Sequence, residues 1–181
     1  LLDIPIDIQF KAVDVASLEG FLPEIDTLPV FDTALLMEHL RAAKRPVILV
    51  GGGTRISHAE EEVRAFAART KIPVVATVNG LDVVEGTYGF AGLHGNTFAN
   101  LAVQNADLLL AFGVRFGQRQ VGKVPQNYTH AKVVHIDIDE NELCRIFPDE
   151  LAIRADLHDF LVGLNVDIAA VPLPDFSAWH A

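Results

Sequence analysis

A chain of 181 residues, half of them hydrophobic, is long enough to fold one α/β domain around a substantial core, and its length alone gives no reason to expect two domains. The net charge of −10, with 14 scattered basic residues, argues against nucleic acid as a partner. No apolar run reaches the roughly 18–20 residues that cross a bilayer, and no N-terminal region resembles a signal peptide, so we expect no membrane association. A single cysteine, Cys144, cannot form an internal disulfide, which favours a reducing compartment and a cytoplasmic location.

The first 32 residues carry few helical signals. Helix breakers interrupt them at Pro5, Gly20, Pro23 and Pro29. Residues 2–8 could form an edge strand, although a proline there argues against a central one. We interpret residues 1–32 as a connector from a missing N-terminal domain that lies along the domain that follows.

Helical and strand patterns alternate over residues 33–166, which we predict to be one α/β domain. Apolar residues at helical spacing indicate helices at 31–43, 57–70, 97–105 and 156–164. Short apolar runs indicate strands at 47–50, 72–76, 107–112, 132–138 and 151–154. This alternation is typical of a three-layer, doubly wound, Rossmann-like parallel sheet, here of about six strands, with helices on both faces. We interpret the tail, 167–181, as a linker to a missing C-terminal domain.

The first predicted strand stops at three glycines, Gly51, Gly52 and Gly53, and a helical pattern follows at once. Glycines permit backbone angles closed to other residues and let a ligand lie against the chain. A helix N-terminus behind such a turn offers unpaired N–H groups to a phosphate. The dinucleotide fingerprint Gly-x-Gly-x-x-Gly fails at its last position, Ile56, so the motif alone does not separate a dinucleotide site from an ordinary tight turn.

Further polar residues follow the other predicted strands. Ligands of open α/β sheets bind outside the carboxyl ends of the strands, which makes Thr77, after the second strand, a contact candidate. Arg115 and Arg119 follow Gly113, and arginine can hold a phosphate through two parallel hydrogen bonds. Asp137 closes a later strand, where a Rossmann-type protein holds a ribose hydroxyl.

A glycine-rich stretch, residues 86–96, should wrap a ligand or cover a crevice. Its His94 could contact a cofactor or tie down the loop. His135, in the middle of a predicted strand, is interpreted as a packed strand residue. The histidines show no metal-ligand spacing, and the chain has no nucleophile elbow and no Walker lysine. The residues thus indicate a nucleotide-binding domain without catalytic machinery of its own, and neither a catalytic nor a metal-ligating residue is predicted.

Several motifs resemble the thiamine diphosphate-dependent enzymes, above all the acetolactate (acetohydroxyacid) synthase catalytic subunit. The motifs are Pro-Val-Ile-Leu-Val-Gly-Gly-Gly, Gly-Leu-His-Gly-Asn-x-x-x-Asn, Ala-Asp-Leu-Leu-Leu-Ala-Phe-Gly-Val-Arg-Phe, Ala-Lys-Val-Val-His-Ile-Asp-Ile-Asp and the later Ala-Asp. They cover most of the chain from residue 45 to about residue 164 and match the central domain of that family. Residues 1–9 resemble the end of its pyrimidine-binding domain.

The resemblance implies that this domain binds FAD in an extended pose, mainly as a structural cofactor. Carried over by motif, the contacts are Gly51, Gly52, Gly53, Thr77, Val78, Leu93, His94, Gly113, Arg115, Arg119, Asp137, Ile138 and Asp156. In this assignment the leucine and histidine lie beside the flavin, the arginines near the phosphates and ribitol, and the 137–138 pair at the adenosine. The family usually has two acids after Val-Arg-Phe, whereas this chain has Gly117 and Gln118.

For the parent protein, the resemblance implies an enzyme of branched-chain amino acid biosynthesis that decarboxylates one 2-oxo acid on thiamine diphosphate and condenses it with a second. Thiamine diphosphate and Mg²⁺ would be held by flanking domains, and a second subunit would complete a homodimer or homotetramer, with a regulatory subunit as a further partner. One alternative is another thiamine diphosphate-dependent decarboxylase or carboligase that holds ADP or no nucleotide here. Another is a non-catalytic module that pairs subunits.

Overall fold

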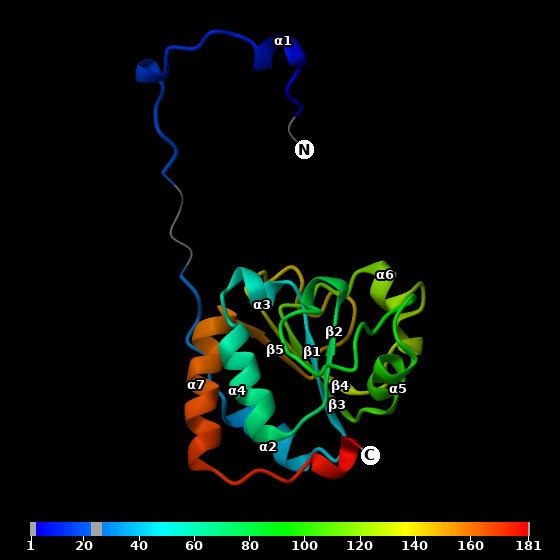
Figure 1. Ribbon diagram of the computed structural model, residues 1–181. Helices are drawn as coiled ribbons and strands as arrows, with labels where there is room; N and C mark the ends of the chain where they lie inside the picture. The colour runs from blue at the N-terminus through cyan, green and yellow to red at the C-terminus, as the bar shows by residue number, and fades with distance from the viewer. Residues whose placement is uncertain (1–2, 23–26, 181) are drawn as a thin grey trace.

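The computed structural model describes residues 3–22 and 27–180 of the chain. Its centre is a parallel sheet of five strands in the order β2-β1-β3-β4-β5. In chain order the strands are β1 Pro46–Val50, β2 Val74–Ala76, β3 Leu108–Phe112, β4 Lys132–Asp137 and β5 Leu151–Arg154. The chain first adds β2 on one side of β1 and then crosses to add β3, β4 and β5 on the other side (Figure 1). This change of direction at β1 makes the fold doubly wound. Rossmann-like α/β architecture is therefore confirmed.

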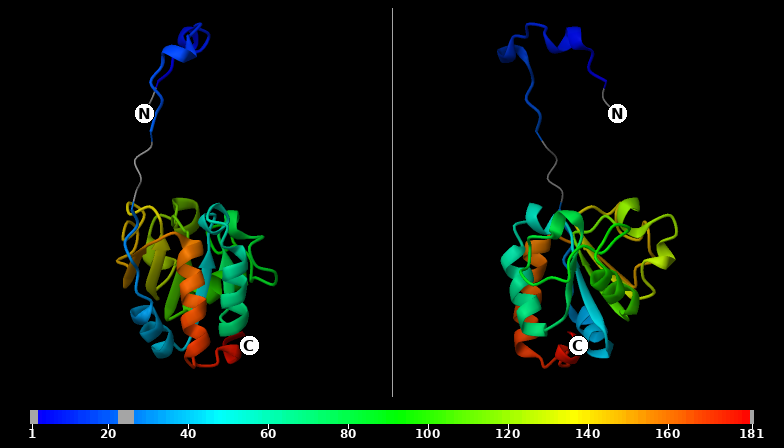
Figure 2. Two further views of the ribbon diagram at one scale, coloured as in Figure 1. Left: turned by 90° about the vertical axis from the view of Figure 1, so that its left-hand side faces the viewer. Right: turned by 45° about the vertical axis from the view of Figure 1, so that its right-hand side comes forward.

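Helices cover both faces of the sheet. The longer ones are α2 Ala34–Ala42, α4 Glu60–Thr70, α5 Thr97–Asn105 and α7 Leu157–Ala170. The short ones are α1 Ile6–Gln9, α3 Gly53–Ile56, α6 Gln118–Val121, η1 Val15–Ser17, η2 Val78–Gly80, η3 Pro125–Asn127 and η4 Ser177–His180. Helices α2, α4 and α7 lie on one side of the sheet and α5 with α6 on the other, as two views show (Figures 1 and 2).

Alternation along the strands divides the core in two. On β1, Ile48 and Val50 point into a cluster with the apolar faces of α2, α4 and α7. Val47 and Leu49 point the other way, into a cluster with α5 and α6. Every residue of β1 is buried, as expected of a central parallel strand that is covered on both faces.

The structure differs from the predicted elements in three places. The described part of residues 2–8 holds one turn of helix, α1, in place of an edge strand, so five strands replace the predicted six. The predicted helix 57–70 begins only at Glu60, because His58 adopts a left-handed φ of 57° and separates α4 from the short helix α3 before it. The last helix extends beyond residue 164 to Ala170, since Leu164 and Ile168 continue its buried face.

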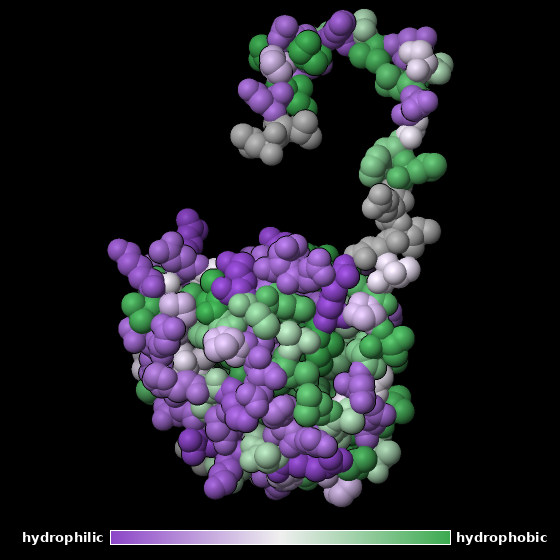
Figure 3. All heavy atoms as spheres, turned by 180° about the vertical axis from the view of Figure 1, so that it is seen from behind, coloured by the Kyte–Doolittle hydropathy of each residue, from purple (hydrophilic) through white to green (hydrophobic). Residues whose placement is uncertain are grey.

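The two ends of the described chain differ. Residues 3–22 are exposed throughout and stand away from the domain with hydrophobic side chains uncovered, so the expectation that they lie along it is wrong (Figures 1 and 3). After α7 the chain returns along the domain, where Phe176 is buried and Trp179 packs against the second cluster. No helix in the described ranges is both long and apolar enough to span a membrane.

Candidate functional site

A cavity of about 860 Å³ lies at the carboxyl ends of the strands. Its walls are the β1–α3 turn, the residues after β2, the β3–α6 loop and the end of β4. The lining residues are Gly51, Gly52, Gly53, Ile56, Ser57, Thr77, Val78, Asn79, Phe90, Gly113, Val114, Arg115, Phe116, Gly117, Arg119, Gln120, Ile136, Asp137, Ile138, Asp139, Asp156 and Leu157. Its volume is in the range of about 300–1,000 Å³ typical of small-molecule and cofactor sites.

The glycine turn touches the β3–α6 loop main chain to main chain. A Cβ added at Gly51 would lie 2.0 Å from the carbonyl oxygen of Gly113, and one at Gly53 would lie 2.7 Å from the Cα of Gly113. Gly113 itself has a left-handed φ of 60°. At Gly52 a Cβ would meet only the side chain of Asn79, at 3.1 Å. Two of the three glycines are thus required by packing, and Gly52 is the one that packing leaves free.

Helix α3, behind this turn, has only four residues. The long helix that we expected to begin directly after the glycines begins instead at Glu60, outside the cavity lining. Main-chain groups of the turn, rather than the N-terminus of a long helix, therefore face the cavity.

Two arginines, Arg115 and Arg119, line the cavity. The Arg115 side chain is 76% exposed, and its Nε lies 3.9 Å from a carboxylate oxygen of Glu142. Because the guanidinium is exposed and the contact is long, the pair contributes little, so the guanidinium can turn to a ligand at small cost. Arg119 extends from α6, whose short helix also carries the lining residue Gln120.

Carboxylates occupy the part of the wall at the end of β4. Burial raises the pKa of Asp137, and a hydrogen bond from the Asp139 main-chain N–H, 3.0 Å long, partly opposes this. The side-chain amide of Asn141 donates to Asp139 and lowers the pKa of that carboxyl. The cavity wall therefore carries both cationic and anionic side chains, and Arg115 lies close enough to Asp139 to help lower the pKa of that carboxyl.

The structure brings all but two of the predicted contacts together in this cavity. Those that line it are Gly51, Gly52, Gly53, Thr77, Val78, Gly113, Arg115, Arg119, Asp137, Ile138 and Asp156. Leu93 and His94 are exposed on the glycine-rich loop and lie outside the lining. The main-chain N–H of Leu93 donates to the Arg119 carbonyl at 3.3 Å, so their loop lies against α6. Their contact with a flavin stays a prediction.

Two lining residues, Phe90 and Gln120, are not among the predicted contacts. Phe90 reaches the cavity because its loop pairs with β2, through a bridge to Ala76. Gln120 is held in place by a 2.9 Å hydrogen bond from its side-chain amide to the hydroxyl of buried Tyr128, which in turn donates to the Ala91 carbonyl. Burial raises the pKa of Tyr128, so the hydroxyl stays protonated as a donor. Contacts between distant loops create these positions.

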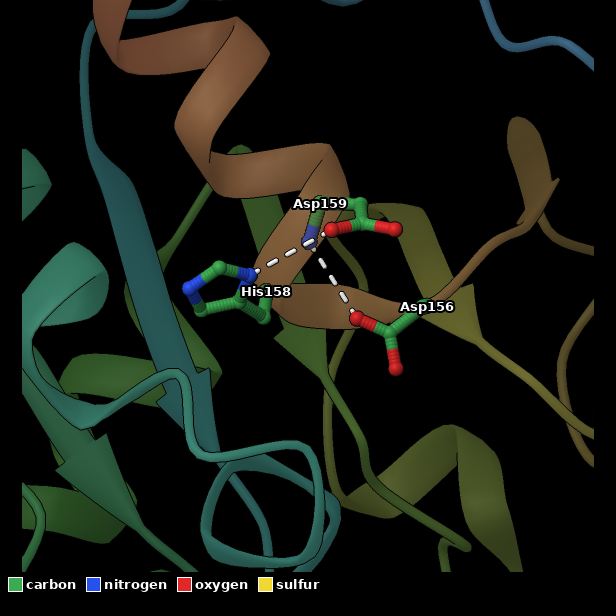
Figure 4. A group of neighbouring side chains, drawn as sticks. All are labelled: Asp156, His158 and Asp159. Carbon is green, nitrogen blue, oxygen red and sulfur yellow. Dashed lines mark hydrogen bonds and ion pairs between the residues drawn. The ribbon is translucent and has the colours of Figure 1, made fainter.

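Near the cavity, Asp156, His158 and Asp159 lie close enough to resemble a metal site (Figure 4). A carboxylate oxygen of Asp156 accepts the main-chain N–H of Asp159 at 3.2 Å, the N-cap bond of α7. His158 Nδ1 lies 3.3 Å from Asp159 Oδ1 on the half-exposed surface. Helix capping accounts for this arrangement without an ion.

Comparison with known proteins places the chain in a family. The model of the family "Thiamine pyrophosphate enzyme, central domain" matches residues 33–164. The acetolactate synthase isozyme 2 large subunit of Escherichia coli (strain K12) is 37% identical over 169 residues, which are 91% of this chain and 31% of the relative. Acetolactate synthase 1, chloroplastic, of Oryza sativa subsp. japonica is 40% identical over 195 residues, 99% of this chain and 30% of the relative.

The chain thus spans less than a third of the length of these relatives. A similar match, 38% identical over 99% of this chain, is found with acetolactate synthase 2, chloroplastic, of Nicotiana tabacum. Since the family model covers residues 33–164, well over half of the chain, the chain belongs to the thiamine pyrophosphate enzyme central domains.

Proposed function

We propose that this chain is the FAD-binding central domain of an acetolactate synthase-like enzyme. Its parent decarboxylates a 2-oxo acid on thiamine diphosphate and condenses the product with a second 2-oxo acid. The observation that carries the nucleotide part is the cavity, which joins the glycine turn, Arg115, Arg119 and Asp137 at the carboxyl edge of the sheet. The acetolactate part rests on the names of the relatives.

The lining residues fit a dinucleotide chemically. A pyrophosphate can lie against Gly52, whose missing side chain opens the wall, with Arg115 and Arg119 to neutralise it. At the end of β4, Asp137 offers a carboxylate oxygen to a ribose hydroxyl, and the exposed Ile138 offers an apolar surface to the adenine. FAD in this site would act mainly as a structural cofactor, while the carbon–carbon chemistry is supplied by thiamine diphosphate.

One observation favours the alternative of ADP or no nucleotide. The residues that replace the usual acids, Gly117 and Gln118, are exposed, and a Cβ at Gly117 would meet nothing within 4 Å. This part of the wall is therefore open and offers no carboxylate to the middle of a dinucleotide. A further alternative is a module that only pairs subunits.

The identity of the retained ligand separates these candidates. The full-length protein is purified without added nucleotide and denatured, and the released small molecules are identified by chromatography and mass spectrometry. FAD supports the proposal, ADP supports another decarboxylase or carboligase branch, and no nucleotide supports the pairing module.

The remaining expectations concern the whole parent and stay proposals. They are Mg²⁺ with thiamine diphosphate in the flanking domains, assembly as a homodimer or homotetramer, a regulatory subunit, and a role in branched-chain amino acid biosynthesis. A cytoplasmic location is a proposal too, and the plant relatives are named chloroplastic. Sedimentation of the full-length protein as a monomer at micromolar concentration would count against the assembly.

A further inference from the structure

His135 makes contacts that simple packing does not require. It lies in the middle of β4, on the α5 side of the sheet, with its side chain 1% exposed. Its Nε2 is 2.8 Å from the carbonyl oxygen of Val114, in the β3–α6 loop. Its Nδ1 is 3.3 Å from Oδ2 of Asp149, in the β4–β5 loop, and that carboxylate is also 1% exposed. One imidazole thus joins two loops from opposite ends of its ring.

The carbonyl partner of Nε2 determines the position of one proton on the ring. A carbonyl oxygen only accepts, so Nε2 carries a hydrogen. Oδ2 of Asp149 already accepts the main-chain N–H of Cys144 at 2.6 Å. Nδ1 is then the ring nitrogen that shares a proton with Oδ2 of Asp149, whichever of the two groups carries it. Each of the two buried side chains thus has a polar partner.

Each of the two loops contains a non-glycine residue in the left-handed backbone conformation, which such residues rarely adopt. Phe116 has φ 47° and Cys144 has φ 55°. The Phe116 ring packs edge-on against His135, with ring centroids 5.2 Å apart, and against Phe147 at 5.0 Å. Strained backbone persists where its surroundings over-determine it, and the His135–Asp149 pair contacts both strained residues.

The joined β3–α6 loop is part of the cavity wall. Val114, Arg115 and Phe116 all line the cavity. Arg145, from the β4–β5 loop, donates to the Arg115 carbonyl, so the two loops are linked a second time next to the first link. Contacts on both sides of Arg115 fix the main chain from which its guanidinium extends.

We propose that the buried His135–Asp149 pair is a positioning pair, which holds the β3–α6 and β4–β5 loops together and thereby presents Arg115 to a ligand phosphate. The ligand part rests on the proposed nucleotide function. His135 itself lies outside the lining and acts through Val114 and Phe116.

A double-mutant cycle tests the proposal in the full-length protein. FAD affinity of the apo protein is measured by fluorescence quenching for the parent, His135→Gln, Arg115→Ala and the double variant. His135→Gln should weaken binding about tenfold, comparable to loss of a charge-assisted phosphate contact. In the Arg115→Ala background it should weaken binding further by less than about twofold, because coupled residues are not additive. Equal losses in both backgrounds, or no loss, would overturn the proposal.

Asp149→Asn is the second variant, with nearly the same shape as the parent. In the parent, Oδ2 accepts the main-chain N–H of Cys144 and lies 3.3 Å from Nδ1 of His135. In the variant, an amide oxygen at that position is a weaker acceptor than a carboxylate oxygen, and an amide NH₂ there cannot accept the Cys144 N–H at all. Asp149→Asn should therefore weaken FAD binding when Arg115 is present and have little further effect in the Arg115→Ala background. His130→Gln, at an exposed histidine, is the matched control and should leave binding unchanged.

Amide hydrogen exchange separates failure of this proposal from failure of the proposed function. Exchange is followed by mass spectrometry in peptides that cover 113–117 and 143–149, in apo protein without any nucleotide. Both peptides should exchange faster in His135→Gln and Asp149→Asn than in the parent and in His130→Gln. Unchanged exchange would overturn the proposal, whatever the protein binds. Faster exchange in a protein that does not bind FAD would leave the positioning pair supported and the FAD assignment wrong.

Discussion

At the scale of single residues, the three glycines of the first turn serve two purposes. Gly51 and Gly53 let the turn approach Gly113 to distances that no side chain would permit. Gly52 has φ −64° and ψ −23°, angles that any residue adopts, so its backbone does not require glycine. The reason for its missing side chain is then to be sought in the cavity.

Gly52→Ala should weaken FAD binding at least tenfold, about 1.4 kcal/mol, because a methyl group would stand where the pyrophosphate is proposed to lie. The apo chain should lose at most about 1 kcal/mol, since the angles suit alanine and Asn79 needs to move by only a few tenths of an ångström. Flavin affinity by fluorescence quenching and apo stability by denaturant titration measure the two effects.

Gly51→Ala is the contrasting variant. Its Cβ would overlap the carbonyl oxygen of Gly113, a main-chain atom, so the apo chain should lose about 1–3 kcal/mol or more of stability. If Gly52→Ala binds FAD like the parent, or destabilises the apo chain as much as Gly51→Ala does, the assignment of Gly52 to a ligand is wrong.

Asp137→Asn should change the stability of the apo chain and its affinity for FAD in opposite directions. Burial raises the pKa of Asp137, so the folded chain holds this proton more tightly than the unfolded chain. That stabilisation is present below the ordinary pKa of an aspartate and is lost as the pH rises through the folded value. Asparagine cannot ionise, so at pH 7 the variant should be more stable than the parent, and the difference should vanish toward pH 3.

The same variant should bind FAD about fivefold more weakly, because a hydroxyl bonds a charged acceptor more strongly than a neutral one by about 1 kcal/mol. Denaturant titrations at both pH values and a flavin titration at pH 7 give the three numbers needed. If the variant and the unsubstituted chain differ in stability by the same amount at pH 3 and at pH 7, the cost of burying the Asp137 charge is not the cause of the difference.

At the scale of elements, Asp156 has two roles that two substitutions can separate. It caps α7 and also lines the cavity. Asp156→Ala should lower apo stability by about 1 kcal/mol through loss of the N-cap, whereas Asp156→Ser should retain most of it because serine also caps helices. Both variants lose the carboxylate and should weaken nucleotide binding alike.

Denaturant titration and flavin affinity, measured on both Asp156 variants, test this separation. Equal stability loss in Asp156→Ser and Asp156→Ala would mean that capping is not what the carboxylate contributes to α7. Unchanged affinity in both would remove Asp156 from the proposed site.

Element boundaries could be predicted where the signals are local. The helix 97–105 and the strand 151–154 were predicted with the bounds that the structure shows. Asn96 caps α5 through its side chain, which accepts the N–H groups of Phe98 and Ala99, and this requires only neighbours in sequence. The break between α3 and α4 carries no glycine or proline, so the left-handed His58 gave no signal.

At the scale of the whole molecule, the chain alone should form no acetolactate from pyruvate, even with thiamine diphosphate and Mg²⁺ added. The condensation needs a cofactor carbanion and a base, and the acetolactate synthase resemblance assigns both to flanking domains. Product is measured after extended incubation of the purified 181-residue chain, with the full-length protein as the positive control. Acetolactate formed by the chain itself would contradict the domain assignment.

By itself the sequence determined the fold class and much of the cavity wall. The hydrophobic periods of strands (two residues) and helices (3.6 residues) depend only on neighbours along the chain, so they predict the elements. Parallel strands bring their carboxyl ends to one edge of the sheet, so Gly52, Arg115 and Asp137 could be expected to lie close together there. Residues at strand ends can therefore be placed without knowing how the loops run.

Only the tertiary structure decided the contacts between loops. Phe90 and Gln120 reach the cavity, and Leu93 and His94 lie outside its lining, because of how the glycine-rich loop lies against β2 and α6. The sequence indicated a packed strand residue at His135, and burial confirmed that much. The pairing of His135 with Asp149 depends on the path of the β4–β5 loop. No periodicity in the sequence predicts such a path, because the contacts that fix a loop join residues that are neighbours only in space.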